Sequence, residues 1–283
     1  MKKIIIGSII ILIVVYAALS LLSSRGEYAA ERLFYRAGKR YSKIQINPDV
    51  APPKMLASVE RDLKTVIKKY PETEPAKAAY ITLAEIYLKD KKYDESIDVL
   101  DAFISSEDKN IALLSRAYFL KGVIYEKQDK WDKALKEFTI LKDKYYNTPI
   151  GLQMPLYIGL YHKKKDNLAE AEKAFNNAVI FYKNLEKEKR GTVLGYSSSN
   201  FLVQTYMGLE NYEEAGNVVN DTIINYPTMM TLVQQLPYVE LIYVKTLKQP
   251  EKATEIYNYI INKTKDDKLK KFLQDKITEL ETP

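Results

Sequence analysis

The sequence predicts an all-α protein built from stacked helix–turn–helix units. Gly is scarce, at 10 of 283 residues, and stretches such as AAYITLAEIYLK (residues 78–89) show helical rather than alternating periodicity. Short apolar patterns recur at intervals of 37 to 44 residues, which is typical of a helical solenoid. With 46% hydrophobic and 28% charged residues, the chain has enough apolar content for a large core in one or two domains.

Residues 4–22 (IIIGSIIILIVVYAALSLL) carry no charge and follow Lys2 and Lys3. As a helix they would span about 28 Å, close to the thickness of a hydrocarbon core. The same pattern describes a secretory signal peptide, with a small-residue cleavage site near Ala18 and Ser20. Because the apolar run continues through Leu21 and Leu22, we favour an uncleaved signal anchor, an N-terminal transmembrane helix within residues 1–24.

The orientation of this anchor stays open. Arg25, Arg32, Arg36, Lys39 and Arg40 follow the span, and counting positive charges alone would place the C-terminal side in the cytoplasm. A short basic stretch before an apolar run is instead the export pattern, and long domains cross largely regardless of charge. We therefore expect a single-pass protein of the inner (cytoplasmic) membrane, with its domain on the periplasmic side.

Residues 27–46 are predicted to form the first helix after the membrane, with an apolar stripe of Leu33, Phe34, Ala37 and Tyr41. The segment 47–53 (NPDVAPP) breaks it.

Five units then align on the small residue that opens each second helix. These small residues are Ser96, Ala134, Ala171, Ala215 and Ala253. Bulky residues follow four positions later, at Leu100, Phe138, Phe175, Val219 and Tyr257. Three positions earlier lie Tyr93, Trp131, Leu168, Tyr212 and Pro250, and nine positions earlier lie Tyr87, Tyr125, His162, Tyr206 and Val244. Small residues would let two helices approach closely, while the large side chains fill the space between units.

This pattern resembles the tetratricopeptide repeat (TPR) family. The resemblance rests on Leu83-Ala84-x-x-Tyr87 with Tyr93 and Ser96, on Gly122-x-x-Tyr125 with Trp131, Ala134 and Phe138, on Gly159 with Ala171 and Phe175, and on Tyr206 with Tyr212, Ala215 and the closing Tyr226-Pro227. It covers about residues 55–263, although the periods exceed 34 residues and the fifth unit keeps little beyond Ala253 and Tyr257. It implies a right-handed α-solenoid.

The expected organisation has four parts. They are the signal anchor (1–24), a juxtamembrane helix with a degenerate first repeat (25–71), the solenoid (72–264) and a C-terminal capping helix (265–283). The longest spacer, residues 183–200, is expected to form either a bulge or a longer first helix with a loose start.

No catalytic chemistry is predicted. The absence of Cys excludes disulfides, thiolate metal sites, thiol nucleophiles and lipidation through Cys. His162, the single histidine, stands where other units carry Tyr, so we interpret it as a packing residue. No Walker, HExxH or G-x-S-x-G motif occurs, and we expect neither an enzyme nor a cofactor. The net charge of +6 comes from interspersed charges, so no nucleic-acid partner is expected.

Stacked first helices would instead form a concave wall for an extended or helical peptide. The predicted wall consists of Ile81, Glu85, Phe119, Val123, Leu156, Leu160, Asn200 and Gln204. An alternative is that several of these residues pack inside the superhelix. The wall lacks the repeated Lys/Asn pattern of the carboxylate clamps found in this family, so a receptor for a C-terminal carboxylate is disfavoured.

The resemblance therefore implies a membrane-anchored scaffold that binds a protein or peptide in the bacterial envelope, in an outer-membrane assembly, Tol–Pal or secretion-type role. One alternative is a translocon- or secretion-associated holding chaperone facing the cytoplasm. A weaker one is an enzyme of the cell-wall or polysaccharide pathway. The sequence predicts neither the partner nor the oligomeric state.

Overall fold

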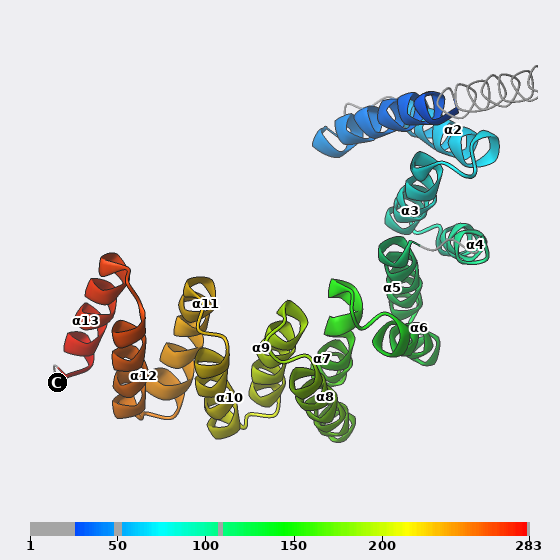
Figure 1. The fold of residues 1–283 in the computed structure, drawn as a ribbon. Coiled ribbons are helices and arrows are strands. Elements are labelled where there is room, and N and C mark those ends of the chain that lie inside the picture. Colours follow the sequence, from blue (N-terminus) through cyan, green and yellow to red (C-terminus); the bar gives the residue numbers. More distant parts are fainter. Residues whose placement is uncertain (1–25, 48–52, 107–109, 282–283) are drawn as a thin grey trace, which may run out of the picture. The chain divides into compact units, whose positions relative to one another are not determined.

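The computed structural model describes residues 26–47, 53–106 and 110–281, and within these ranges the chain is helical, without strands (Figure 1). A first helix covers residues 26–46. It is followed by α2 (Pro53–Lys69), α3 (Glu74–Lys89), α4 (Tyr93–Ile104), α5 (Ile111–Lys127), α6 (Trp131–Lys144), α7 (Pro149–Lys164), α8 (Leu168–Glu188), α9 (Val193–Gly208), α10 (Tyr212–Asn225), α11 (Met229–Val239), the π-helix η1 (Glu240–Thr246), α12 (Pro250–Lys263) and α13 (Asp267–Glu281). The all-α prediction is confirmed.

The chain divides into two compact units, one ending at Ile140 and one beginning at Leu141. Among the described helices, none has both the length and the apolar character needed to cross a bilayer. The predicted anchor, residues 4–22, lies outside the described residues.

The repeat spacing is confirmed by the second helix of each pair. α4, α6, α8, α10 and α12 begin at Tyr93, Trp131, Leu168, Tyr212 and Pro250, the positions expected from the alignment. The aligned small residues and the bulky residues four positions later are all buried. First helices of successive repeats contact each other within each unit, α3 with α5 and α7 with α9. The spacing therefore identified the residues through which the helices pack.

Glycines on first helices allow phenylalanines of second helices to pack against the backbone. A β-carbon at Gly122 would collide with the Phe138 ring, and one at Gly159 would collide with the Phe175 ring. The Phe175 ring also lies close to Gly208 of the next repeat, where a β-carbon would be 2.8 Å away. One ring thus joins three helices at a distance that only glycine permits.

Each first helix from α3 to α11 begins with a short polar cap. The N-cap residues Thr73, Asn110, Thr148, Thr192 and Thr228 each accept a hydrogen bond from the backbone N–H three residues later, which satisfies one of the free donors of the first turn.

The turn between the two helices of a repeat has the same geometry in five repeats. A non-glycine residue with positive φ precedes each second helix, at Lys91, Asp129, Asp166, Glu210 and Lys248. The next backbone N–H closes the turn by donating to a carbonyl near the end of the first helix. These bonds join Lys92 to Tyr87, Lys130 to Tyr125, Asn167 to His162, Asn211 to Tyr206 and Gln249 to Tyr243, at 2.8 to 3.0 Å.

Replacing Lys91 by valine is expected to lower the free energy of unfolding by about 1 kcal/mol, because a β-branched residue is poorly tolerated in the left-handed region. Lys91 is exposed and has φ 60°, so the backbone conformation dominates the effect. Urea denaturation followed by circular dichroism measures the change. Lys91→Gly is the control and should leave stability unchanged or slightly raised. Equal midpoints for the two variants would contradict the explanation.

The long spacer is neither of the predicted forms. The helix α8 has 21 residues, whereas α6, α10 and α12 each have 14. The extra length therefore belongs to the second helix of the third pair, and α9 starts regularly after the Thr192 cap. The prediction of a bulge or an extended first helix was wrong because the apolar period of α8 continues to the buried Leu185.

In the fifth helix pair, formed by α11 with η1 and by α12, one predicted repeat position was wrong. Its turn bond reaches Tyr243, which is buried, whereas the predicted Val244 is only half-buried. The shift arises in η1, where Leu247 N–H donates to the Ile242 carbonyl five residues earlier, at 2.8 Å. This wider turn takes up one extra residue, so the aromatic position is occupied after all.

The helix over residues 26–46 packs against α2 and α3. Ala30 and Ala37 are fully buried in a cluster with Val59, Leu63 and Val66 of α2. Beside this cluster the buried carboxylate of Asp62 accepts hydrogen bonds from Arg36 (2.7 and 2.8 Å) and Arg40 (2.8 Å). These bonds fix the rotation of the first helix on α2 and decide which of its faces remains exposed.

Candidate partner-binding surface

The predicted wall residues in the first unit are only partly available to a partner. Ile81 is buried in the cluster of Leu100 and Phe103. The carboxylate of Glu85 accepts two hydrogen bonds from the Arg116 guanidinium, at 2.7 and 3.0 Å. The two remaining residues, Phe119 and Val123, are half-buried, and the Phe119 ring lies 6.3 Å from the Phe138 ring.

In the second unit the predicted wall residues differ strongly in exposure. Leu156 is buried, whereas Leu160, one turn further along α7, has 46% of its surface exposed. Asn200 and Gln204 on α9 use their amides to contact the next first helix. Asn200 Oδ1 accepts a 2.7 Å hydrogen bond from Gln235 on α11, and Gln204 hydrogen-bonds the Tyr238 hydroxyl. Burial raises the pKa of that hydroxyl, and the bond from Gln204 offsets part of the effect.

The eight predicted residues therefore share the first helices but not one role. Ile81 and Leu156 belong to the core, and Glu85, Asn200 and Gln204 hold neighbouring first helices together. Leu160 is the one whose side chain is most open to a ligand. That these residues bind a partner stays a prediction.

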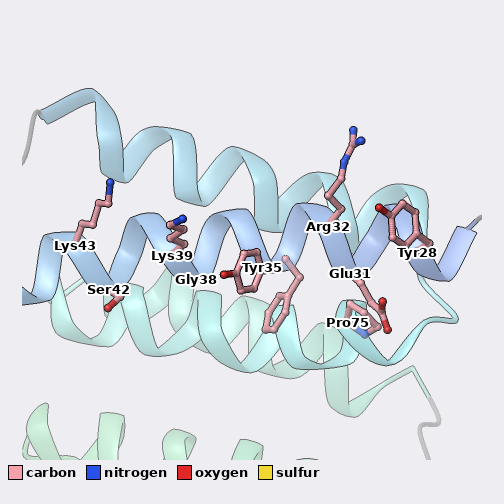
Figure 2. A pocket seen from close by; sticks show the side chains of 10 residues that line it. Tyr28, Glu31, Arg32, Tyr35, Gly38, Lys39, Ser42, Lys43 and Pro75 are labelled. Atoms are coloured by element: carbon pink, nitrogen blue, oxygen red, sulfur yellow. The ribbon is translucent and has the colours of Figure 1, made fainter.

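A groove that the sequence reasoning missed lies along the helix of residues 26–46 (Figure 2). It has a volume of about 870 Å³, and Pro75 at the start of α3 closes one side. Aromatic and basic side chains dominate its lining, which includes Tyr28, Arg32, Phe34, Tyr35, Lys39 and Lys43. Tyr28 and Tyr35 are 66% and 71% exposed, which is unusual for large aromatic side chains.

The signal that could have revealed this groove is the distribution of charge along the chain. Residues 26–71 contain ten Lys and Arg but five Asp and Glu, a net charge of +5 out of +6 for the whole chain. Residues 72–283 have a net charge of −2. Over the full chain the charges look interspersed. The positive excess becomes visible only when residues 26–71, which contain the first repeat, are counted separately.

Within the described ranges, no group of three or more His, Cys, Asp or Glu side chains is placed to hold a metal ion. His162 lies in the last turn of α7, at the position that tyrosines occupy in other repeats, and its ring contacts that of Tyr161 edge-on at 5.6 Å between centroids.

Paired antiparallel helices that repeat along the chain form a helical solenoid, which is the class of protein that this fold defines. Family models then specify the repeat. Residues 78–110, which cover most of α3 and α4, and residues 116–148, which cover most of α5 and α6, each match a tetratricopeptide repeat model. These two helix pairs therefore match tetratricopeptide repeats, a repeat type typical of protein-interaction scaffolds.

Two solved structures show the extent of similarity. A tetratricopeptide repeat protein from Parabacteroides merdae ATCC 43184 is 16% identical, with a TM-score of 0.40, over 90% of this chain and 87% of that one. The TPR domain of P58(IPK) is 12% identical, with a TM-score of 0.34, over 89% of this chain and 65% of that one. No curated protein matches the chain.

Proposed function

We propose that the protein is a membrane-anchored, non-enzymatic scaffold that presents its tetratricopeptide repeats to a protein or peptide partner in the bacterial envelope. The observation that carries the proposal is the combination of repeated helix pairs with an uncharged segment at residues 4–22. This segment ends four residues before residue 26, where the described helix of residues 26–46 is already present, so the repeats would be held close to the bilayer without a long stalk. The domain boundaries at residues 24, 71 and 264 belong to this proposal.

Leu160 gives the proposal a testable contact. It is an exposed apolar side chain on a first helix, where stacked repeats offer a groove to a peptide. In-cell crosslinking of the tagged, full-length protein, followed by mass spectrometry, identifies the proteins that bind along the first helices. Leu160→Glu is expected to reduce the yield of the specific crosslinks about tenfold, because a carboxylate would have to be desolvated at the contact.

Ile180→Glu is the matched control. Ile180 is 61% exposed in the same unit but lies on a second helix, so the variant should keep the wild-type crosslinks. Equal loss in both variants, or loss in neither, would contradict binding through the first helices. Capture of envelope or secretion components would support the proposed setting, whereas capture of cytosolic proteins alone would argue against it.

A cytoplasmic holding chaperone is the second candidate, and one observation favours it. Arg25, Arg32, Arg36, Lys39 and Arg40 follow the apolar segment directly, as expected when the C-terminal side stays in the cytoplasm. Protease added to intact spheroplasts separates the two candidates. Digestion of the repeats would place them outside the inner membrane, and full protection would favour the chaperone.

A further inference from the structure

One face of the first helix combines exposed aromatic rings with positive charges. Tyr28, Arg32, Tyr35, Lys39 and Lys43 follow each other at intervals of three or four residues, so they lie along one side of the helix. All five are exposed, and Figure 2 shows them along the groove. The lining also includes one acidic residue, Glu31, and the neutral residues Gly38 and Ser42. We call these eight residues the aromatic–basic face.

The rest of the helix holds this face outward. Ala30 and Ala37 on the opposite side are fully buried, and Arg36 and Arg40 are engaged with Asp62 of α2. Rotating the helix to bury Tyr28 and Tyr35 would expose these alanines and break both ion pairs. The exposure of the two rings is therefore a fixed property of the fold.

The charge of this region suits an anionic surface. The first repeat carries a net charge of +5, while the residues from 72 onward carry −2, so a negatively charged surface would attract this end of the chain selectively. Tyrosine beside Lys and Arg is also the combination that proteins place at the level of lipid headgroups. An apolar body with a hydroxyl tip suits the boundary between acyl chains and water.

The position in the chain favours a membrane over an acidic protein as the occupant. Three residues separate the apolar segment 4–22 from residue 26, the first described residue of the helix over residues 26–46. Even fully extended, this connection spans no more than about 14 Å. If residues 4–22 cross a bilayer, the aromatic–basic face starts within reach of the headgroups on the side where the segment emerges.

We propose that the aromatic–basic face lies against the anionic headgroups of the membrane in which the protein is anchored. Arg32, Lys39 and Lys43 pair with lipid phosphates, while Tyr28 and Tyr35 insert their rings at the headgroup level. This inference rests on the anchoring in the proposed function. It assigns the first repeat to the bilayer and leaves the later repeats to the protein partner.

The test uses the full-length chain and a single cysteine. The natural chain has no Cys, and a side chain added at Gly38 would meet nothing within 4 Å, so Gly38→Cys places an environment-sensitive dye on the face without disturbing the packing. The labelled protein is reconstituted into vesicles of phosphatidylcholine alone, or of phosphatidylcholine with one third phosphatidylglycerol. Flotation measures membrane attachment, and a water-soluble quencher measures access to the dye.

The dye is expected to become at least about threefold less accessible in the phosphatidylglycerol vesicles than in the neutral ones, because attraction to anionic lipid brings the face to the surface. The same dye at Asn177→Cys, exposed on α8, should respond equally to both lipids. The triple variant Arg32→Glu, Lys39→Glu, Lys43→Glu should abolish the protection. A variant with the same change in charge, Lys187→Glu, Lys268→Glu, Lys271→Glu, should keep it, since these lysines are exposed in the second unit.

The possible outcomes separate the two proposals. Flotation with both lipids and equal quenching at residue 38 would overturn the headgroup contact and leave the anchor standing. Flotation with the phosphatidylglycerol vesicles alone, with a protected dye, would support the contact and contradict the anchor. Flotation with neither would overturn both. Protection by added polyglutamate but not by anionic lipid would overturn the lipid assignment in favour of an acidic protein partner.

Discussion

Replacing Phe175 by alanine is expected to lower the free energy of unfolding by about 3–5 kcal/mol, the usual cost of removing a buried aromatic ring from a core. The ring is 1% exposed and packs between the backbones of Gly159 on α7 and Gly208 on α9. Neither glycine has a side chain that could move into the space, so the cavity would persist. Chemical denaturation of the full chain, followed by circular dichroism, measures the loss.

Two further variants test whether the glycine contact is the cause. Phe272→Ala on α13 removes a ring that is 49% exposed, and it should cost less than about 1 kcal/mol. Gly159→Ala should destabilise the wild type, because the new methyl group collides with the ring, but should cost less in the Phe175→Ala background, where the ring is gone. Additive effects of the two substitutions would show that the ring and the glycine do not pack as described.

Replacing Tyr182 by phenylalanine is expected to cost about 1–3 kcal/mol, although it removes one oxygen atom. The Tyr182 hydroxyl is completely buried, donates to the Leu152 carbonyl at 2.7 Å and accepts from the Leu156 N–H at 3.3 Å. These two backbone groups would pair with each other in a regular helix. The hydroxyl thus bridges a carbonyl and an N–H one turn apart, beside Pro155, which lies inside α7.

The same hydroxyl makes stability sensitive to alkaline pH. Burial raises the pKa of Tyr182 well above the usual value near 10, and burial also raises the pKa of Tyr226 and of Tyr257, each to about 12. The folded state therefore favours the protonated phenols. Their contribution is fully present below about pH 10, the pKa of the unfolded chain, and is lost as pH rises through the folded values.

Unfolding measured between pH 9 and pH 12 should accordingly show a falling midpoint above about pH 10. The decline should be shallower in Tyr182→Phe than in the wild type, because one of the buried phenols no longer titrates. Tyr28→Phe, which removes an exposed hydroxyl outside the core, is the control for the substitution itself. A wild-type midpoint that stays level to pH 12 would contradict the role of the buried phenols.

The sequence predicts the packing of this fold well because packing repeats. Ser96, Ala134 and Ala215 were identified by spacing alone, and each is fully buried where two helices meet. An irregularity that occurs in only one repeat is harder to predict. The extra residue in η1 leaves the apolar pattern of the fifth pair intact to within one position, so the pattern could not distinguish Val244 from Tyr243.

The candidate surface was less predictable because it depends on which polar groups find partners. Asn200 and Gln204 look like a polar binding wall in the sequence, but Gln235 and Tyr238 from the next first helix engage them. Such pairs join residues 34 or 35 positions apart and follow no period. The exposed Tyr28 and Tyr35 were missed for the opposite reason, since large aromatic residues are normally assigned to a core.

The π-helix η1 also bears on how an array of this kind can change during evolution. The inserted residue is absorbed within one turn, and the following bend, with positive φ at Lys248, keeps the form it has elsewhere. Helix α12 therefore starts in step with its predecessors despite the longer chain. Insertions that would shift every later contact in a single packed core remain local here, so repeats of unequal length can accumulate while each interface with its neighbour is preserved.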